Sequence, residues 1–363
     1  MGTIHPKHIY SRILAALLAI TVAAPASAQS CVGDLNDDGV INGADLGQLL
    51  AAWGPCQSCE ADLSANGVVD GADLGVQLGN WGECVTIPTW AMVVQAQPDP
   101  AVVTDAALRT AIVATGRPWR VRDTATQVEM LLVPPGTFQM GCILGSAQHG
   151  CMAAEQPVHH VTLTTPFYLG RYEVTQLQWQ SQMGNNPSFF DNASTQVPES
   201  QVPNRPVEIV SWTEIQGYLS ATGFRLPTEA EWEYACRAGT QTPFHSGPGF
   251  PNGTNDDSLV SQVAWYAPNS GGQTRPVGVK AANAFGFHDM LGNVWEWVND
   301  WYGGYSADAQ ANPTGPVSAS KCVIRGGSWV AIEGSLFVRS SYRNSLTPGS
   351  RNANIGFRVA RTP

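Results

Sequence analysis

The sequence predicts an α+β protein in which a small helical module precedes one larger mixed domain. Low charge content, with 37 glycines and 25 prolines among 363 residues, favours short elements joined by many turns over long helices or disorder. Short apolar runs bounded by Pro, Gly or Thr, such as residues 130–133 and 160–163, are strand signals. Residues 31–84 contain a tandem repeat of a different character, so a second structural unit is expected.

The first 28 residues have the layout of a secretory signal. Lys7 and Arg12 precede an apolar stretch over residues 13–24, and small residues lead up to Ala28. The stretch is too short to cross a bilayer as a helix, and no later segment is longer or more apolar. We therefore expect export to the periplasm, the cell surface or the medium, and no membrane span.

Acidic residues are concentrated in residues 31–84, which hold nine Asp and Glu side chains and no Lys or Arg in a chain of net charge −10. Such a segment disfavours nucleic acids and anionic membranes as partners and favours a divalent cation. The eight cysteines are even in number and lie in a chain expected to be exported, which favours disulfides.

The repeat has a period of 28 residues: CVGDLNDDGVINGADLGQLLAAWGPC from residue 31, then CEADLSANGVVDGADLGVQLGNWGEC from residue 59. Both copies place oxygen-bearing side chains at positions 1, 3, 5, 9 and 12 of a calcium loop, with glycine at position 6 and a backbone carbonyl at position 7. The predicted calcium ligands are Asp34, Asn36, Asp38, Val40, Asn42 and Asp45 in the first copy, and Asp62, Ser64, Asn66, Val68, Asp70 and Asp73 in the second. The alternative is that both runs are ordinary Asp/Asn/Gly turns, although the copies agree at every ligand position.

Asp at position 12, followed directly by a helix such as residues 46–53, resembles the type I dockerin repeat. Two tandem copies make one such module, and the resemblance implies a cohesin-like partner for residues 31–84. Dockerins bind through loop positions 10 and 11, which are often hydroxyl-bearing but here are Gly43-Ala44 and Gly71-Ala72, so the partner stays open. Of the three possible pairings, Cys31 with Cys56 and Cys59 with Cys84 is the simplest.

Residues 85–116 lack a repeat or a clear periodicity and include three prolines. We predict a linker there, with one short helix around residues 105–114. Three capping boxes then mark helix starts in the large domain, residues 117–361: Thr175 with Gln178, Ser211 with Glu214, and Thr228 with Glu231. Few helices and many short strands favour the α+β class.

Six motifs in order give the large domain a resemblance to the formylglycine-generating enzyme (sulfatase-modifying factor) family. They are MLLVPPGTFQMG at 130–141, YEVTQLQW at 172–179, FRLPTEAEWEYA at 224–235, DMLGNVWEW at 289–297, RGGSW at 325–329 and IGFR at 355–358. The resemblance implies the irregular C-type-lectin-like mixed α/β fold of that family.

Catalytic members of the family oxidise a sulfatase cysteine to formylglycine with oxygen and with copper held by two cysteines after the GGS motif. The corresponding positions here are Ala331 and Leu336, which offer no donor to a soft metal, so copper is not expected and no catalytic residue is assigned. Ser328 matches a serine of the family's active site but is expected to hold a backbone turn. We predict disulfides between Cys142 and Cys151 and between Cys236 and Cys322; a displaced copper pair is the alternative.

The family also binds calcium beside the GNVWEW sequence. Carried over by position, the ligands are the side chains of Asp289 and Glu296 and the carbonyls of Gly292 and Val294. The alternative is that Asp289 and Glu296 cap the backbone or pair with arginines. Calcium is therefore the expected cofactor of both parts of the chain.

Three further groups have structural interpretations that we favour. His159 and His160 with Glu155 resemble a metal site but fall at a strand entry. Trp295, Trp297 and Trp301 could form a sugar platform, yet aromatic residues at this spacing are more often core. Arg339 and Arg343 are expected to pair with carboxylates rather than with a substrate anion.

The leading functional hypothesis is an exported, non-catalytic binding or scaffold protein, in which calcium-ordered docking repeats present the large domain to a peptide or polysaccharide ligand. The alternative is a formylglycine-generating oxidase that acts on a sulfatase cysteine. A third reading, sulfoxide synthesis, requires an iron-binding helical domain, for which the histidine-free repeats could not serve.

Overall fold

The computed structural model describes residues 29–36, 40–56, 59–143, 150–191, 197–330 and 334–363. Three sequence predictions lie outside these ranges: the signal over residues 1–28, the calcium ligand Asp38, and Ala331 at one copper position. None of the helices in the described ranges is long and apolar enough to cross a membrane.

The helices are short and the strands shorter. The α-helices are α1 (Gly43–Ala51), α2 (Gly71–Gly79), α3 (Ala106–Val113), α4 (Gln176–Met183), α5 (Trp212–Thr222), α6 (Glu229–Arg237), α7 (Asp257–Val260) and α8 (Ala267–Ser270), with 3-10 turns η1 (Ala153–Glu155), η2 (Glu199–Asn204) and η3 (Gly334–Val338). The first strands are β1 (Gln29–Ser30), β2 (Val40–Ile41), β3 (Gly54–Pro55), β4 (Val68–Val69), β5 (Gly82–Glu83), β6 (Val85–Thr86), β7 (Ala91–Gln95), β8 (Arg120–Asp123), β9 (Glu129–Val133) and β10 (Gly136–Met140). The others are β11 (His159–Leu163), β12 (Phe167–Gly170), β13 (Ala264–Trp265), β14 (Leu291–Gly292), β15 (Trp295–Trp301), β16 (Gln310–Ala311), β17 (Cys322–Arg325), β18 (Arg343–Leu346), β19 (Ile355–Phe357) and β20 (Ala360–Arg361).

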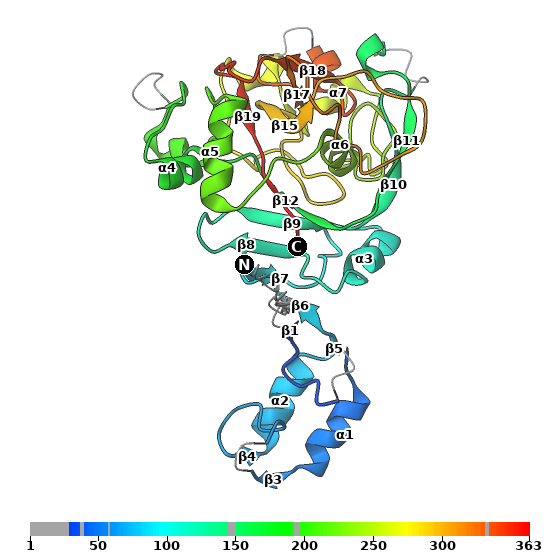
Figure 1. The fold of residues 1–363 in the computed structure, drawn as a ribbon, viewed down its shortest axis with the longest axis vertical. Coiled ribbons are helices and arrows are strands. Elements are labelled where there is room, and N and C mark those ends of the chain that lie inside the picture. The colour runs from blue at the N-terminus through cyan, green and yellow to red at the C-terminus, as the bar shows by residue number, and fades with distance from the viewer. Residues whose placement is uncertain (1–28, 37–39, 57–58, 144–149, 192–196, 331–333) are drawn as a thin grey trace, which may run out of the picture.

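Residues 31–84 form a small unit at one end of the molecule, which we call the repeat module (Figure 1). Helices α1 and α2 begin at equivalent places because Asn42 and Asp70 each cap a helix and form a capping box with the Asp three residues on. The pairs β2–β5 and β3–β4 each join one copy to the other, so the module is not purely helical as predicted. Its own small core consists of Leu49, Cys56, Ala61 and Val69.

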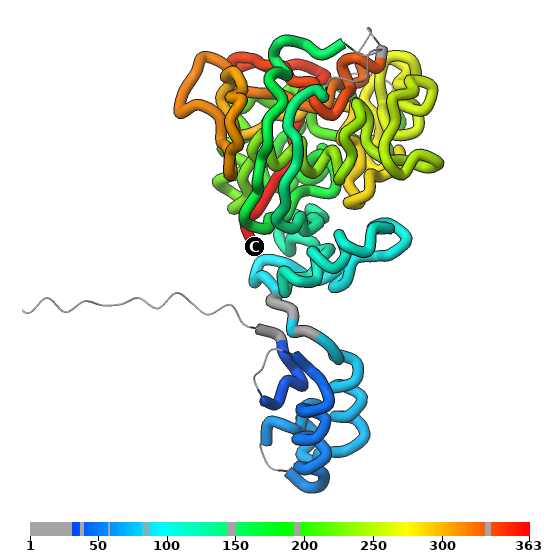
Figure 2. Tube along the Cα trace, turned by 90° about the vertical axis from the view of Figure 1, so that its right-hand side faces the viewer, coloured from blue at the N-terminus to red at the C-terminus, as the bar shows by residue number. Residues whose placement is uncertain are grey.

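The segment predicted as a linker is mostly part of the large domain. Strand β7 adds to the edge of a five-stranded sheet in the order β20-β12-β9-β8-β7, and Val103 and Ile112 are fully or almost fully buried in the main core. Helix α3, between its caps Asp105 and Ala114, confirms the predicted short helix. The linker prediction is wrong from Ala91 onward, since these residues lie against the large domain on its side nearest the repeat module (Figure 2). None of the five residues of the edge strand β7 is fully buried, so its sequence gives little indication of a strand.

Helix α6 runs through the interior of the large domain. All but one of its nine residues are buried, and the sheet β18-β17-β15-β19 packs against it. The predicted capping boxes at Thr175, Ser211 and Thr228 are all formed, so α4, α5 and α6 begin where the sequence places them. Helix α6 thereby brings charged side chains of the FRLPTEAEWEYA motif into the core.

The cysteine pairing differs from the predicted one at three places. Cys31 bonds to Cys84 and Cys56 to Cys59, because the β1–β6 pair brings the two ends of the repeat module together. Cys142 and Cys151 form the predicted disulfide. Cys236 and Cys322 are buried but unpaired: Cys236 faces the Met290 carbonyl, and Cys322 lies opposite Leu346 at the start of β17.

Disulfide mapping checks this pairing. We expect non-reduced peptides that join Cys31 to Cys84, Cys56 to Cys59 and Cys142 to Cys151, because each pair is bonded in the structure. Cys236 and Cys322 are expected to react with iodoacetamide only after denaturation, since both are buried. A Cys236–Cys322 peptide, or a Cys31–Cys56 peptide, would contradict the structure.

Candidate functional site

Helix α6 carries two carboxylates into a buried ion-pair network. Glu229 accepts hydrogen bonds from Arg343 and Arg325, and Glu233 accepts from Arg325 and Arg237. The Arg325 guanidinium is completely buried and also donates to the carbonyls of Ser340 and Ser341. Because a buried charge is costly without partners, this network fixes β17 and β18 against α6.

A second buried cluster lies at the turn that the DMLGNVWEW motif forms. Glu173, Asp289 and Glu296 are each at most 1% exposed, and burial, followed by the other two carboxylates, raises the pKa of Glu173 well above its usual range. Burial also raises the pKa of Asp289 to about 6. Glu173 accepts from the Asn293 amide at 2.6 Å and from the Val294 N–H at 3.1 Å. The cluster therefore concentrates negative charge within the core.

The two predicted calcium ligands with carboxyl side chains, Asp289 and Glu296, differ in their hydrogen-bond partners. Both oxygens of Glu296 are engaged by Arg358, at 2.7 Å each, and one also accepts from the Trp232 indole, so Glu296 pairs with an arginine as the alternative expects. Asp289 accepts from the Gly278 N–H through Oδ2, while its buried Oδ1 has no hydrogen-bond partner. An unpartnered buried carboxylate oxygen among excess negative charge fits a hard cation.

The second repeat gathers its predicted ligands in one loop. Asp62 accepts from the backbone N–H groups of Asn66 and Gly67, and Asp73 accepts from those of Ser64 and Asp70. Gly67 has a φ of +85°, the left-handed conformation that position 6 requires. The Ser64 side chain at position 3 lies beside the Asp73 carboxylate, where, after the hydrogen bond from the Asp70 N–H, one from this side chain helps to lower the Asp73 pKa, and its hydroxyl oxygen keeps lone pairs for a cation.

The first repeat shows the same arrangement in its described part. The buried Asp45 carboxylate accepts from the N–H groups of Leu35, Asn36 and Asn42. The Asn42 amide donates to the Val40 carbonyl at 3.1 Å. In both repeats the residue at position 12 therefore contacts the start of the loop. A cation site formed by the two ends of one loop requires this contact.

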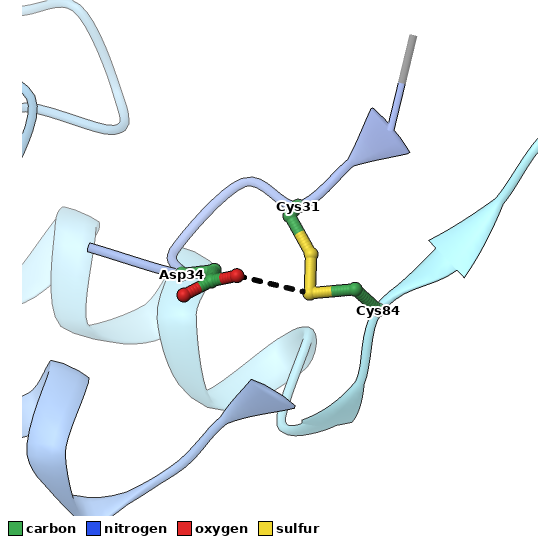
Figure 3. Close-up of side chains that lie close together, drawn as sticks. All are labelled: Cys31, Asp34 and Cys84. Atoms are coloured by element: carbon green, nitrogen blue, oxygen red, sulfur yellow. Dashed lines mark hydrogen bonds between the residues drawn. A yellow bond between two sulfur atoms is a disulfide. The ribbon is translucent and has the colours of Figure 1, made fainter. Parts of the chain in front are cut away.

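Cys31, Asp34 and Cys84 also lie close together (Figure 3). Among the described residues they are the one group of three His, Cys, Asp or Glu side chains whose ligand atoms all lie within 4.8 Å of one another. Asp34 Oδ2 is 3.4 Å from Cys84 Sγ. The two sulfurs are bonded to each other, so neither is a thiolate that could bind a soft metal. This group is therefore a disulfide beside the first residue of the calcium loop.

Leu336, one of the two positions that the resemblance aligns with copper-binding cysteines, lies in η3. Ser328, which matches an active-site serine, is buried beside Asn354, whose amide donates to the Ser328 hydroxyl at 3.2 Å. Burial raises the pKa of the Cys236 thiol to about 12 and that of the Cys322 thiol to about 11. Copper(I) is bound by thiolates, and these two side chains are held as thiols.

The structural interpretations of the three further groups agree with the contacts. Arg339 pairs with both oxygens of Glu155, which removes that carboxylate from any site with His159 and His160. Arg343 pairs with Glu229. Trp297 is fully buried, whereas Trp295 and Trp301 are only partly covered, so the three tryptophans do not form one platform.

A family model described as the sulfatase-modifying factor enzyme 1-like domain matches residues 119–363, which is more than half of the chain. The chain belongs to the sulfatase-modifying factor family. The repeat module lies outside the residues that this family model matches.

Individual relatives agree with this assignment. The chain is 33% identical over 254 residues to the serine/threonine-protein kinase pkn1 of Chlamydia caviae, covering 64% of this chain and 38% of that protein. It is 32% identical over 210 residues to the formylglycine-generating enzyme of Mus musculus, covering 56% of this chain and 53% of the enzyme. The chain thus spans about half or less of the length of these relatives.

Among solved structures, Treponema denticola variable protein 1 is similar, with a TM-score of 0.56 and 29% sequence identity. The similarity covers 65% of this chain and 95% of the other chain.

Sequence reasoning missed two buried carboxylates of this family domain. Glu173 lies inside the YEVTQLQW motif and reaches the Asn293 and Val294 turn 120 residues further along the chain. Asp300 follows the WEW sequence, and its Oδ2 accepts from the Glu229 N–H at 2.8 Å. No local signal distinguishes either one, because YEVTQLQW contains other polar residues and Asp300 follows Asn299 outside the DMLGNVWEW motif.

Asp300 makes stability fall as the pH rises. Burial, and then the neighbouring Glu229, raises its pKa to about 8, Glu231 acts in the same direction and Arg343 opposes it. Between about pH 4 and pH 8 the unfolded chain ionises this carboxyl while the folded chain keeps it protonated, which costs up to about 1.4 kcal/mol per pH unit. We expect Asp300→Asn, which keeps the acceptor for Glu229, to be more stable than the parent at pH 8. The difference should shrink towards pH 4 in urea unfolding curves, and parallel pH profiles would contradict this.

Proposed function

We propose that this chain is an exported calcium-binding protein whose sulfatase-modifying-factor domain binds a ligand without copper oxidation, and whose repeat module attaches it to a partner. The observation that supports the absence of copper oxidation most directly is the side chain at position 336. A leucine stands where the resemblance places a copper-binding cysteine, and Cys236 and Cys322 are buried thiols with raised pKa values. These residues therefore do not provide two thiolates that could bind one copper ion together.

Calcium is supported in both parts of the chain. In the second repeat the Ser64 hydroxyl beside Asp73 and the inward-turned Asp62 and Asp73 carboxylates fit a hard cation, and the first repeat follows the same pattern. In the family domain the candidate donor is Asp289 Oδ1, close to the Glu173 charge. A bound cation would order the loops and offset the negative charge of the acidic segment.

Attachment through the repeat module is supported by paired apolar residues on its surface. Leu50 and Trp53 follow the first loop, and Leu78 and Trp81 occupy the equivalent positions of the second, each about half exposed. Large apolar side chains at the same place in two tandem repeats form a surface suited to a protein partner. A cohesin-like protein is the partner class that the repeat pattern favours.

Metal analysis of the purified full chain tests this proposal. We expect calcium and no stoichiometric copper, even after incubation with Cu(I), and no oxygen uptake in the presence of a cysteine-containing sulfatase peptide. The alternative function, formylglycine generation, predicts one copper per chain and oxygen uptake with that peptide. Either of those results would overturn the non-catalytic assignment, whereas a chain that retains no calcium would overturn the metal assignment.

A further inference from the structure

A cavity of about 430 Å³ lies in the family domain at the end of β15. Its walls include His159, Asp300, Trp301, Tyr305, Thr314 and Pro316, and Leu336 is not one of them. This volume is within the range of small-molecule sites. A second cavity of about 260 Å³ shares Thr314 with it and is lined by Asn299, Asn312 and Thr228 among others.

Asp300 presents an unused oxygen to the first cavity. The residue is 3% exposed, and its Oδ2 is fixed by the Glu229 N–H. Within the described part of the chain, no group hydrogen-bonds to Oδ1. That oxygen lies on the side of Gly315, another wall residue, where an added Cβ would come within 3.3 Å of it. With its other oxygen held by the Glu229 N–H, Oδ1 is the Asp300 atom left to hydrogen-bond a ligand in the cavity.

His159 supplies a second polar group to the same cavity. The residue is 3% exposed, and its Nδ1 lies 3.1 Å from the Pro157 carbonyl oxygen. A carbonyl only accepts, so Nδ1 carries a hydrogen, and Nε2 is the ring nitrogen left to contact a ligand. The ring packs 4.9 Å from that of Tyr305, which holds its orientation.

The formal charges around the cavity are already paired. Arg343 is bound to both oxygens of Glu229, and the Tyr305 hydroxyl donates to that same carboxylate. In the second cavity Arg225 and Glu231 form a two-point pair. With no unpaired cation available, the site disfavours phosphate and carboxylate ligands, and its remaining groups suit neutral hydroxyls.

We propose that this cavity binds a neutral saccharide, with Asp300 and His159 hydrogen-bonded to ring hydroxyls and with Trp301 against its apolar surface. Hydroxyl groups both donate and accept, so they match a carboxyl oxygen and an imidazole nitrogen placed in one cavity. Aromatic side chains cover the C–H face of such a ligand. This inference deepens the proposed binding role and rests on it, but it does not depend on the repeat module or on calcium.

Saturation-transfer NMR with the full chain tests the proposal, using the methyl glycosides of glucose, galactose, mannose and N-acetylglucosamine as probes. We expect at least one glycoside to bind, with and without EGTA. His159→Phe, which keeps the ring but loses both nitrogens, is expected to weaken that binding about tenfold or more. The matched control is His160→Phe, because His160 is the exposed neighbour on the same strand.

Asp300→Ala gives a second variant should His159→Phe not fold, as judged from its thermal unfolding midpoint. Binding of none of the glycosides would overturn the proposal, as would equal affinity in the parent and all variants. Binding of only a neutral acetyl-(Ala-Pro)₃-amide peptide would also overturn it and would assign the cavity to peptide. The copper and oxygen-uptake measurements do not use this cavity. They test the proposed function, whereas glycoside binding tests this inference, so the failure of one can be distinguished from the failure of the other.

Discussion

Replacing Arg325 with Met is expected to destabilise the family domain by about 3–5 kcal/mol. Arg325 is completely buried and pairs with Glu229 at 3.0 Å and with Glu233 at 2.6 Å. Methionine fills much of the same volume but leaves two buried carboxylates with less positive charge and two carbonyls, those of Ser340 and Ser341, without their donor. Urea unfolding followed by tryptophan fluorescence measures the loss.

The matched control is Arg351→Met. Arg351 also pairs with a glutamate, Glu214, at 2.8 Å, but their side chains are 54% and 37% exposed. Solvent screens such a pair, so the expected change is about 0–1 kcal/mol. If the two variants lost equal stability, burial would not explain why the Arg325 network contributes more to the free energy of unfolding than an exposed ion pair.

Asp73→Ala is expected to remove one calcium ion per chain. Asp73 occupies position 12 of the second loop, where its two oxygens accept from the Ser64 and Asp70 N–H groups and hold the loop closed. A carboxylate has about four lone-pair directions, so these two bonds leave room for a cation. The substitution removes a ligand and opens the capping box of α2 together. Calcium content after dialysis and calorimetric titration measure the change.

Glu60→Ala controls for charge alone. Glu60 lies in the same acidic module but is exposed and outside the ligand positions. It is expected to leave the number of bound calcium ions unchanged, because removing one screened surface charge weakens the field without removing a ligand. Equal calcium stoichiometry in the parent and in Asp73→Ala would rule out this loop as a calcium site.

Interactions between residues near in sequence were predictable. The helix starts at Thr175, Ser211 and Thr228 follow from a hydroxyl and a carboxyl or amide three residues apart, and the structure forms all three capping boxes. The family assignment likewise follows from motifs that are contiguous in the sequence, and the family model confirms it. Each of these features depends on spacing that the sequence displays directly.

The cysteine pairing and the strand formed by residues 91–95 could not be predicted from neighbouring residues alone. Cys31 bonds to Cys84, 53 residues away, because the first and last strands of the repeat module pair. Pairing each cysteine with its nearest bracketing partner takes no account of that contact between strands. Residues 91–95 look featureless in the sequence, yet they complete the edge of the five-stranded sheet, since backbone hydrogen bonding needs no side-chain pattern.

By itself the sequence determined the family, the helix starts, and the loop positions at which oxygen atoms recur, because all of these are set by neighbours within a few residues. The tertiary structure alone decided which cysteines meet, that Glu173 approaches Asp289 and Glu296, and that Asp300 and His159 face one cavity. The carboxyl cluster and the cavity join residues more than a hundred positions apart, and Cys31 and Cys84 are 53 apart. Such contacts arise when the chain buries its apolar surface and must satisfy the charges enclosed with it.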